Sequence, residues 1–165
     1  MRTLEQLKKT FDIKDFRGQQ ESIITNALNG TDSLVLMPTG GGKSFCYQAP
    51  IFLKQKLGII ISPLISLMKD QVEKLRALGL NAHFLNSSLD YDQKKIVIDD
   101  LNSGSCLYLY VAPETAVKSR FLKFIQKFDL SLIAIDESHC ISKWGHQFRP
   151  EYQEIVKLIN QFPDT

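Results

Sequence analysis

Residues 39–44 read TGGGKS and lie between a short apolar run, SLVLM at 33–37, and a segment with helical character. Three consecutive glycines let the backbone curl so that its N–H groups point inward and form a nest for an anion. The lysine adds a positive charge, and the N-terminus of the following helix adds its own positive end. The pattern therefore predicts a strand, a phosphate-binding loop and a helix, in that order.

Within this loop we expect Lys43 to contact the β- and γ-phosphates of a nucleotide and Ser44 to offer its hydroxyl to Mg²⁺. The strict pattern GxxxxGK[ST] has glycine at position 37, where this chain has Met37. The alternative is a glycine-rich turn with a solvated lysine. The other members of the predicted cradle are Thr39, Gly40, Gly41 and Gly42.

Along the rest of the chain, short apolar or β-branched runs alternate with longer stretches of helical period. Such alternation is typical of βαβ units, so we predict an α/β fold of three layers, with a mostly parallel central sheet and helices on both faces. Ligands of such sheets bind beyond the carboxyl ends of the strands. The predicted strands are 33–37, 58–62, 82–85, 107–111 and 131–136, and the predicted helices include 64–78, 90–101 and 151–162.

An acidic pair follows the last predicted strand, where SLIAID ends in Asp136 and Glu137 comes next. A carboxylate at the end of a buried strand is costly unless it has a partner, and a phosphate-bound Mg²⁺ is such a partner. We expect Asp136 to hold the metal, partly through water, and Glu137 to orient or deprotonate an attacking water. Such a pair alone is also a common start of a loop. His139 and Lys43 complete the predicted catalytic group.

A cluster of aromatic and basic residues follows the acids directly. Aromatic faces stack on unpaired bases, and arginine adds cation–π and phosphate contacts. We expect this loop to bind a single strand and to couple that binding to nucleotide hydrolysis. The alternative is that its large aromatic residues are core residues under a loop. The cluster consists of Trp144, His146, Phe148 and Arg149.

Length and charge exclude several classes of protein. A chain of 165 residues is long enough for one compact domain with its own core. The formal net charge of +2 is too small to indicate a nucleic-acid binder by itself. Without a long apolar segment, we expect neither a transmembrane helix nor a signal peptide. Three cysteines without CxxC spacing favour buried thiols in a reducing compartment over disulfides or zinc.

Taken in order, these segments resemble the motifs of the RecQ family of superfamily two DNA helicases. The final block is the most discriminating, because other superfamily two helicases share DExH but lack WGHxFRPxY. The resemblance implies that residues 1–165 form a first RecA-like helicase domain. The matching segments are FRGQQESII (16–24), MPTGGGKS (37–44), SPLISLMKDQ (62–71), NSS (86–88), YVAPE (110–114) and DESHCISKWGHQFRPEY (136–152).

The resemblance also implies roles for residues outside the phosphate loop and the acids. Arg17 and Gln20 would contact the adenine base. Ser62 and Lys69 are the better candidates for contacts with DNA backbone phosphates. Two further residues are expected either to bind DNA phosphate or to cap the next helix; they are Asn86 and Ser87.

The chain departs from the family pattern at a few positions. Ile13 stands where many relatives have an aromatic residue against the adenine, which predicts weaker base stacking. Gln147 stands where the family commonly has aspartate, which predicts a weaker link between the aromatic loop and the nucleotide. Gly18 and Gln19 replace the usual proline-glycine pair, a change that affects loop stiffness more than chemistry.

By resemblance, the expected cofactors are ATP and Mg²⁺, and the expected partner is single-stranded or partially duplex DNA, unwound in the 3′-to-5′ direction. A second RecA-like domain with an arginine finger, a zinc-binding subdomain and a winged helix follow in this family. We therefore expect residues 1–165 alone to be a monomer that binds nucleotide and DNA weakly and hydrolyses negligibly. The expected compartment is the nucleoid-containing cytoplasm of a bacterium or the nucleus of a eukaryote. Alternatives are a stand-alone P-loop switch, a DEAD-box RNA helicase domain and a small-molecule kinase.

Overall fold

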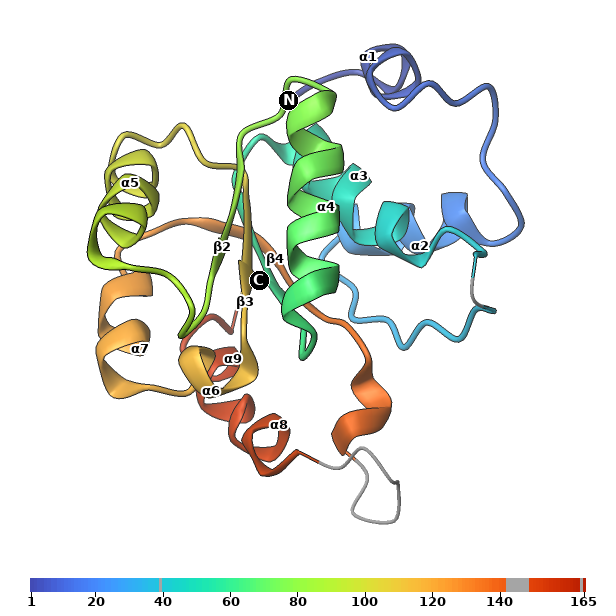
Figure 1. The fold of residues 1–165 in the computed structure, drawn as a ribbon. Helices are drawn as coiled ribbons and strands as arrows, with labels where there is room; N and C mark the ends of the chain where they lie inside the picture. The colour runs from blue at the N-terminus through green and yellow to red at the C-terminus, as the bar shows by residue number, and fades with distance from the viewer. Residues whose placement is uncertain (39, 142–148, 164) are drawn as a thin grey trace.

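The computed structural model describes residues 1–38, 40–141, 149–163 and 165, and its centre is a parallel sheet of four strands (Figure 1). The strand order is β2-β3-β1-β4, and every pairing is parallel. Parallel strands need crossover connections, and helices supply them here. The predicted α/β fold with a parallel sheet is confirmed. The strands are β1 (Leu57–Ile61), β2 (Ala82–Leu85), β3 (Tyr108–Val111) and β4 (Leu130–Ile135).

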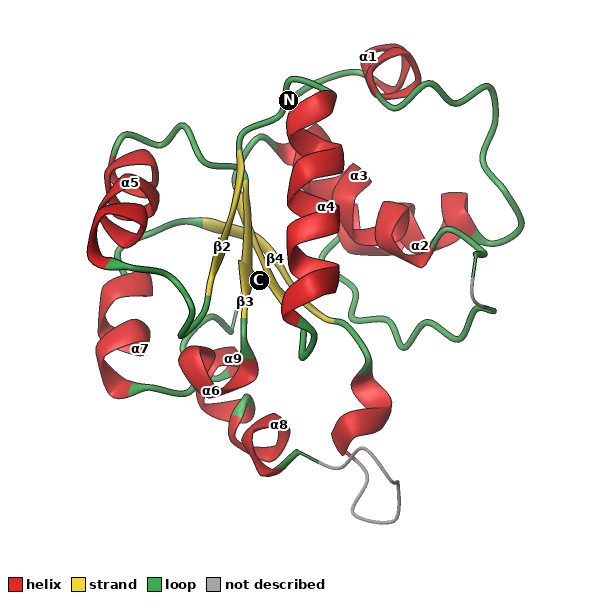
Figure 2. Ribbon diagram, viewed as in Figure 1, coloured by secondary structure: helices red, strands yellow, loops and turns green. Residues whose placement is uncertain are grey.

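Helices cover both faces of this sheet, which gives the three layers visible in Figure 2. None of the described helices is long and apolar enough to cross a membrane. The helices are α1 (Leu4–Thr10), α2 (Gln20–Leu28), α3 (Lys43–Lys54), α4 (Ile65–Ala77), α5 (Tyr91–Asn102), α6 (Pro113–Ala116), α7 (Ser119–Ile125), α8 (Pro150–Glu154) and α9 (Val156–Ile159), with a 3₁₀ turn η1 (Ser138–Ile141).

The central strand β1 explains why both faces need helices. Its sequence LGIII is buried throughout, and successive isoleucines point to opposite faces. Ile59 and Ile61 belong to one core, and Ile60 belongs to the other. A run of β-branched residues buried on both sides is typical of a strand in a parallel sheet.

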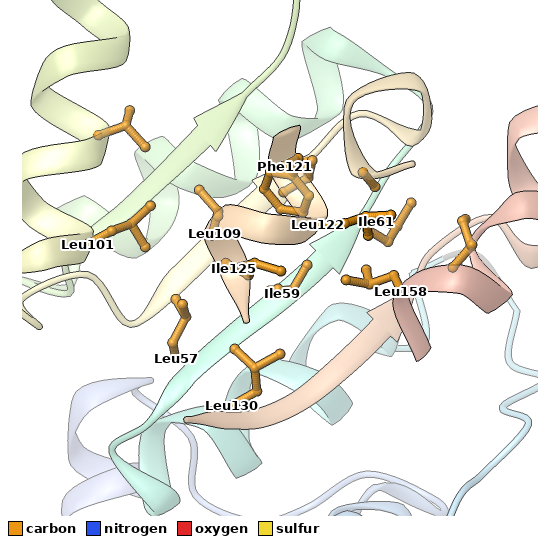
Figure 3. Packing of buried hydrophobic residues seen from close by; sticks show 14 of the residues in the cluster. Leu57, Ile59, Ile61, Leu101, Leu109, Phe121, Leu122, Ile125, Leu130 and Leu158 are labelled. Atoms are coloured by element: carbon orange, nitrogen blue, oxygen red, sulfur yellow. The ribbon is translucent and has the colours of Figure 1, made fainter. Parts of the chain in front are cut away.

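Two hydrophobic cores lie on the two faces. The first lies between the sheet and helices α5, α7, α8 and α9, and Figure 3 shows Phe121, Leu122 and Ile125 of α7 gathered over Ile59 and Leu109. The second core packs α3 and α4 against the opposite face, where Tyr108 and Tyr110 are fully buried. The sheet thus holds α3 rigidly by its apolar side.

The predicted boundaries of β1, β3, β4, α4 and α5 are correct to within one residue, and β2 is as predicted. The predicted helix 151–162 is instead divided at Ile155 into α8 and α9.

The predicted strand at 33–37 is wrong, because this segment is irregular and its Leu34 and Leu36 are 79% and 83% exposed. The backbone N–H and C=O groups of a strand need hydrogen-bond partners on a neighbouring strand. A groove of about 840 Å³ lies between this segment and β4 instead, lined by residues of both.

Candidate active site

The phosphate loop turns sharply into α3 through glycines with left-handed backbone conformations. Gly40 has φ +80° and Gly42 has φ +83°, which residues with a Cβ rarely adopt. The Gly41 N–H donates to the Pro38 carbonyl at 3.0 Å, which closes the turn. Gly42 is the N-cap of α3 and has no side chain to cap the helix. Lys43 and Ser44 are the first two residues of that helix. Left-handed glycines at a helix N-terminus are common in anion-binding loops, and the anion nest itself stays a prediction.

Gln20, predicted to contact adenine, holds this loop in place. Its side chain is 5% exposed, and its Nε2 donates to the Gly42 carbonyl at 3.3 Å. Its Oε1 accepts from the Arg17 backbone N–H at 2.8 Å. Gln20 therefore ties the segment before α2 to the phosphate loop, while Arg17 itself remains exposed.

We predict that Gly42→Ala destabilises the domain more than Gly40→Ala. Both substitutions force alanine into a left-handed backbone, at a cost of about 1 kcal/mol. A Cβ at Gly42 would also collide with Gln20 Nε2, whereas a Cβ at Gly40 meets nothing within 4 Å. The expected difference is roughly 1 kcal/mol in the free energy of unfolding, measured by urea titration. Equal losses in the two variants would show that the Gln20 contact contributes nothing.

The first acid stands where β4 ends. The Asp136 N–H donates to the Ile61 carbonyl at 2.9 Å, so Asp136 continues the pairing of β4 with β1. Burial raises the pKa of the Asp136 carboxyl, and the charge of Glu137 adds to the rise, while a hydrogen bond from the Glu137 N–H and the charge of Lys43 oppose it. This carboxylate is poorly solvated and lies within electrostatic reach of the phosphate-loop lysine.

The second acid has a strained backbone. Glu137 has φ +52°, a conformation that is uncommon for a residue with a Cβ and is often found at functional sites. Its Oε2 lies 3.3 Å from His139 Nδ1, so the imidazole can hold the carboxylate in place. The side chain is 32% exposed and can reach solvent. The turn thus presents one carboxylate beside the other without burying both.

The fold brings the predicted catalytic residues to one groove. This groove is the one between residues 30–38 and β4, and it is lined by Lys43, Asp136, Glu137 and His139. Among the described residues, no cluster of three His, Cys, Asp or Glu side chains forms a metal site. A Mg²⁺ bound by the predicted ligands would take one carboxylate and one hydroxyl from the protein, and its other oxygen ligands would come from phosphates and water. The predicted ligands, Ser44 and Asp136, have that hard-oxygen chemistry.

We predict that Asp136→Asn stabilises the domain in the absence of nucleotide. The native pKa of Asp136 lies above its unfolded value of 3.8, so the native state binds more protons there. Stability from this group is fully present below pH 3.8 and is lost as the pH rises through the raised pKa. Asparagine does not ionise, so the variant keeps this stability. Its free energy of unfolding should therefore exceed that of the unchanged chain by an amount that grows as the pH rises, to about 1 kcal/mol at neutral pH.

Urea titrations of both proteins between pH 4 and pH 8 measure this advantage. Asp32→Asn is the matched control, because Asp32 is exposed in an irregular segment and should change stability by less than about 0.5 kcal/mol. A destabilised Asp136→Asn variant at neutral pH would mean that the attraction from Lys43 outweighs the cost of burial.

The residues predicted to bind DNA are placed unequally. Lys69 on α4 and Ser87 are exposed. Ser62 is 1% exposed and Asn86 is 2% exposed, and in both a buried polar atom lacks a hydrogen-bond partner within the described part of the chain. Arg149 is partly exposed and precedes α8. Trp144, His146 and Phe148 of the predicted aromatic loop lie outside the described residues, as do Gln147 and Thr39 of the phosphate loop.

The capping alternative for Asn86 and Ser87 is wrong. Asp90 caps α5, accepting from the Gln93 N–H in a capping box. Asn86 instead forms a local turn in which its Oδ1 accepts from the Ser88 N–H at 2.8 Å. Neither residue can cap α5, because the N-cap position directly precedes Tyr91, where that helix begins.

Two tyrosines belong to this site that the sequence analysis did not assign to it. Tyr152 is 3% exposed, as expected of a core residue, and its hydroxyl donates to the Asp136 carbonyl at 2.9 Å. Tyr47 on α3 lines the groove with its hydroxyl buried. Only the position of Tyr47 one turn after Lys43 could have indicated it, because residues four apart share a helix face.

Comparison with known proteins gives a consistent answer at the level of sequence. Residues 17–165 match the family profile described as DEAD/DEAH box helicase. An ATP-dependent DNA helicase RecQ from Haemophilus influenzae is 50% identical over 162 residues, which cover 98% of this chain and 26% of that protein. The RecQ of Bacillus subtilis is 43% identical over 157 residues, covering 93% of this chain and 26% of that protein. The chain thus spans about a quarter of the length of these relatives.

Solved structures share the fold at low sequence identity. The DUF1998 helicase MrfA superposes with a TM-score of 0.75 at 16% identity, over 98% of this chain and 27% of that chain. A hypothetical ATP-dependent RNA helicase from Sulfolobus tokodaii gives a TM-score of 0.59, also at 16% identity, over 97% of this chain and 55% of that chain. At such identities the likeness concerns the fold of the helicase domain alone.

Proposed function

The chain belongs to the DEAD/DEAH box helicase family, as the ATP-binding domain of a RecQ-type helicase, and from that membership we propose how its residues act. The whole protein would couple ATP hydrolysis to 3′-to-5′ movement on single-stranded DNA and to unwinding of duplex DNA. The single observation that carries this proposal is the groove that brings Lys43, Asp136 and Glu137 together at the carboxyl end of β4.

The phosphate loop supplies binding. Its N–H groups and the positive end of α3 favour the β- and γ-phosphates, and Lys43 adds a full positive charge. Lys43 also attracts the carboxylate of Asp136. Ser44 and Asp136 would hold Mg²⁺, which neutralises charge on the β- and γ-phosphates when it is bound.

Glu137 supplies the general base in this proposal. Its carboxylate reaches solvent and is held by His139, so it can accept a proton from a water molecule that attacks the γ-phosphate. Tyr152 supports the same turn through its hydrogen bond to the Asp136 carbonyl. The positive charge expected on the far side of the γ-phosphate would come from an arginine of a second domain, so residues 1–165 alone should hydrolyse ATP very slowly.

The proposed partners are single-stranded and partially duplex DNA and further domains of the same protein in cis. The names of the sequence relatives support DNA over RNA as the substrate. The exposed Lys69 on α4 and the partly exposed Arg149 would contact DNA phosphates. We propose that residues 1–165 are monomeric. We also propose that the protein acts at the nucleoid if it is bacterial and in the nucleus if it is eukaryotic.

A titration with a fluorescent ATP analogue tests this function. Residues 1–165 should show saturable binding that requires Mg²⁺ and that tightens when a single-stranded oligonucleotide is added. Removing Mg²⁺ with a chelator should weaken the binding, since Asp136 and the phosphates would then repel each other. A complete lack of saturable binding, with or without DNA, would overturn the proposal.

A further inference from the structure

A buried polar bridge joins α3 to α4 below the phosphate loop. Gln48 on α3 is 7% exposed, and its Nε2 donates to Gln71 Oε1 on α4 at 3.0 Å. The same nitrogen donates to the Tyr110 hydroxyl on β3, also at 3.0 Å. Both N–H groups of the amide are therefore used, one toward the sheet and one toward the neighbouring helix.

The bridge begins close to the nucleotide groove. Gln48 follows Ser44 by one helical turn, and its neighbour Tyr47 packs its ring on Tyr110 with the centroids 6.5 Å apart. The Tyr47 hydroxyl is buried near the side chains of Ser44 and Tyr110. Tyr47 lines the groove, and its ring contact leads to Tyr110, whose hydroxyl accepts from Gln48.

The bridge ends on a helix whose outer side carries a proposed DNA contact. Lys69 is exposed on α4, while Gln71 is partly buried on the side that meets α3. The backbone of α3 is fixed at the same point, since the Tyr108 hydroxyl donates to the Gln48 carbonyl at 3.0 Å. A shift of α4 relative to α3 would therefore break the Gln48–Gln71 hydrogen bond and leave a buried donor unsatisfied.

We propose that Gln48 is a positioning residue that couples the two sites: DNA bound along α4 and nucleotide bound at the start of α3 change each other's affinity through its hydrogen bond to Gln71. The coupling is reciprocal, because a shared hydrogen bond that both ligands favour must act in both directions. This inference rests on the proposed function and adds the residues through which the nucleotide site would respond to DNA.

Substitutions at Gln71 test the coupling, since Gln71 is partly exposed and is not among the residues that line the groove. Gln71→Leu removes the acceptor, and Gln71→Glu keeps it. The readout is the ratio of dissociation constants for a fluorescent ATP analogue without and with saturating single-stranded oligonucleotide. Gln71→Leu should lower this ratio by about 2- to 10-fold, the worth of one hydrogen bond, or to unity. Gln71→Glu should keep it within about twofold.

Two controls separate coupling from damage. Gln126→Leu, an exposed glutamine next to α7, should leave the ratio unchanged. The affinity of Gln71→Leu for the analogue without DNA should stay within about threefold of the unchanged chain. The inference would be overturned if Gln71→Leu left the ratio unaltered. It would also be overturned if DNA did not change the nucleotide affinity of the unchanged chain. Neither result would contradict nucleotide binding itself. A chain that binds no nucleotide at all would instead overturn the proposed function.

Discussion

Lys43→Ala should weaken binding of a fluorescent ATP analogue in Mg²⁺ by about 10- to 100-fold. Hydrogen bonds to charged groups contribute about 1.5–3 kcal/mol, and each 1.4 kcal/mol corresponds to a factor of ten in affinity. Lys43 is the first residue of α3 and lines the groove. Among the described residues, no other lysine or arginine lines this groove. The Lys43 ammonium would lie against the β- and γ-phosphates, so losing it removes a charge that no other described residue of the groove replaces.

The same substitution should leave the fold intact. A positive charge at the N-terminus of a helix opposes the helix dipole, and relief of that repulsion offsets the lost attraction between Lys43 and Asp136, so the free energy of unfolding should change little. Lys95→Ala on α5 is the matched control, because Lys95 is exposed and α5 packs beside β2, the strand at the other edge of the sheet from β4. Equal affinities for Lys43→Ala and the unchanged chain would refute the assignment of the phosphate loop.

Strands β1 and β3 could be predicted closely because their signal is local. The run Ile59–Ile61 consists of β-branched residues that are buried on both faces, and such a run strongly favours a central strand. The segment 33–37 has a similar composition, yet Leu34 and Leu36 are exposed. A strand exists only when a neighbour accepts its hydrogen bonds, and residues 33–37 carry no information about that neighbour.

The residues of the candidate site also differ in how far the sequence could predict them. Asp136 and Glu137 could be predicted to lie at the carboxyl edge of the sheet, where ligands of parallel sheets bind, and the TGGGKS motif indicated the same place for Lys43. The role of Gln20 could not, because it depends on the Gly42 carbonyl 22 residues away. The burial of Ser62 and the positive φ of Glu137 likewise depend on tertiary packing that no local pattern encodes.

The largest effect is expected from Glu137→Gln in a protein that contains the proposed second domain with its arginine. ATP hydrolysis should fall by about 10²–10⁴-fold, the usual contribution of a general base, while nucleotide affinity is kept or improved. Affinity should not fall, because the charge of Glu137 helps to raise the pKa of Asp136. Removing that charge makes Asp136 easier to ionise, and an ionised Asp136 is the form that holds a metal ion.

Glutamine has nearly the shape of glutamate, so it can take the same backbone conformation at φ +52° and still accept a hydrogen bond from His139. Single-turnover hydrolysis and analogue binding, measured on the same preparation, separate the chemical step from affinity. Glu73→Gln, an exposed residue on α4, is the control for loss of one negative charge. If Glu137→Gln hydrolysed ATP within about threefold of the unchanged protein, Glu137 would not be the base. The base would then have to be sought among the other carboxylates that line the groove, Asp136 and Asp32.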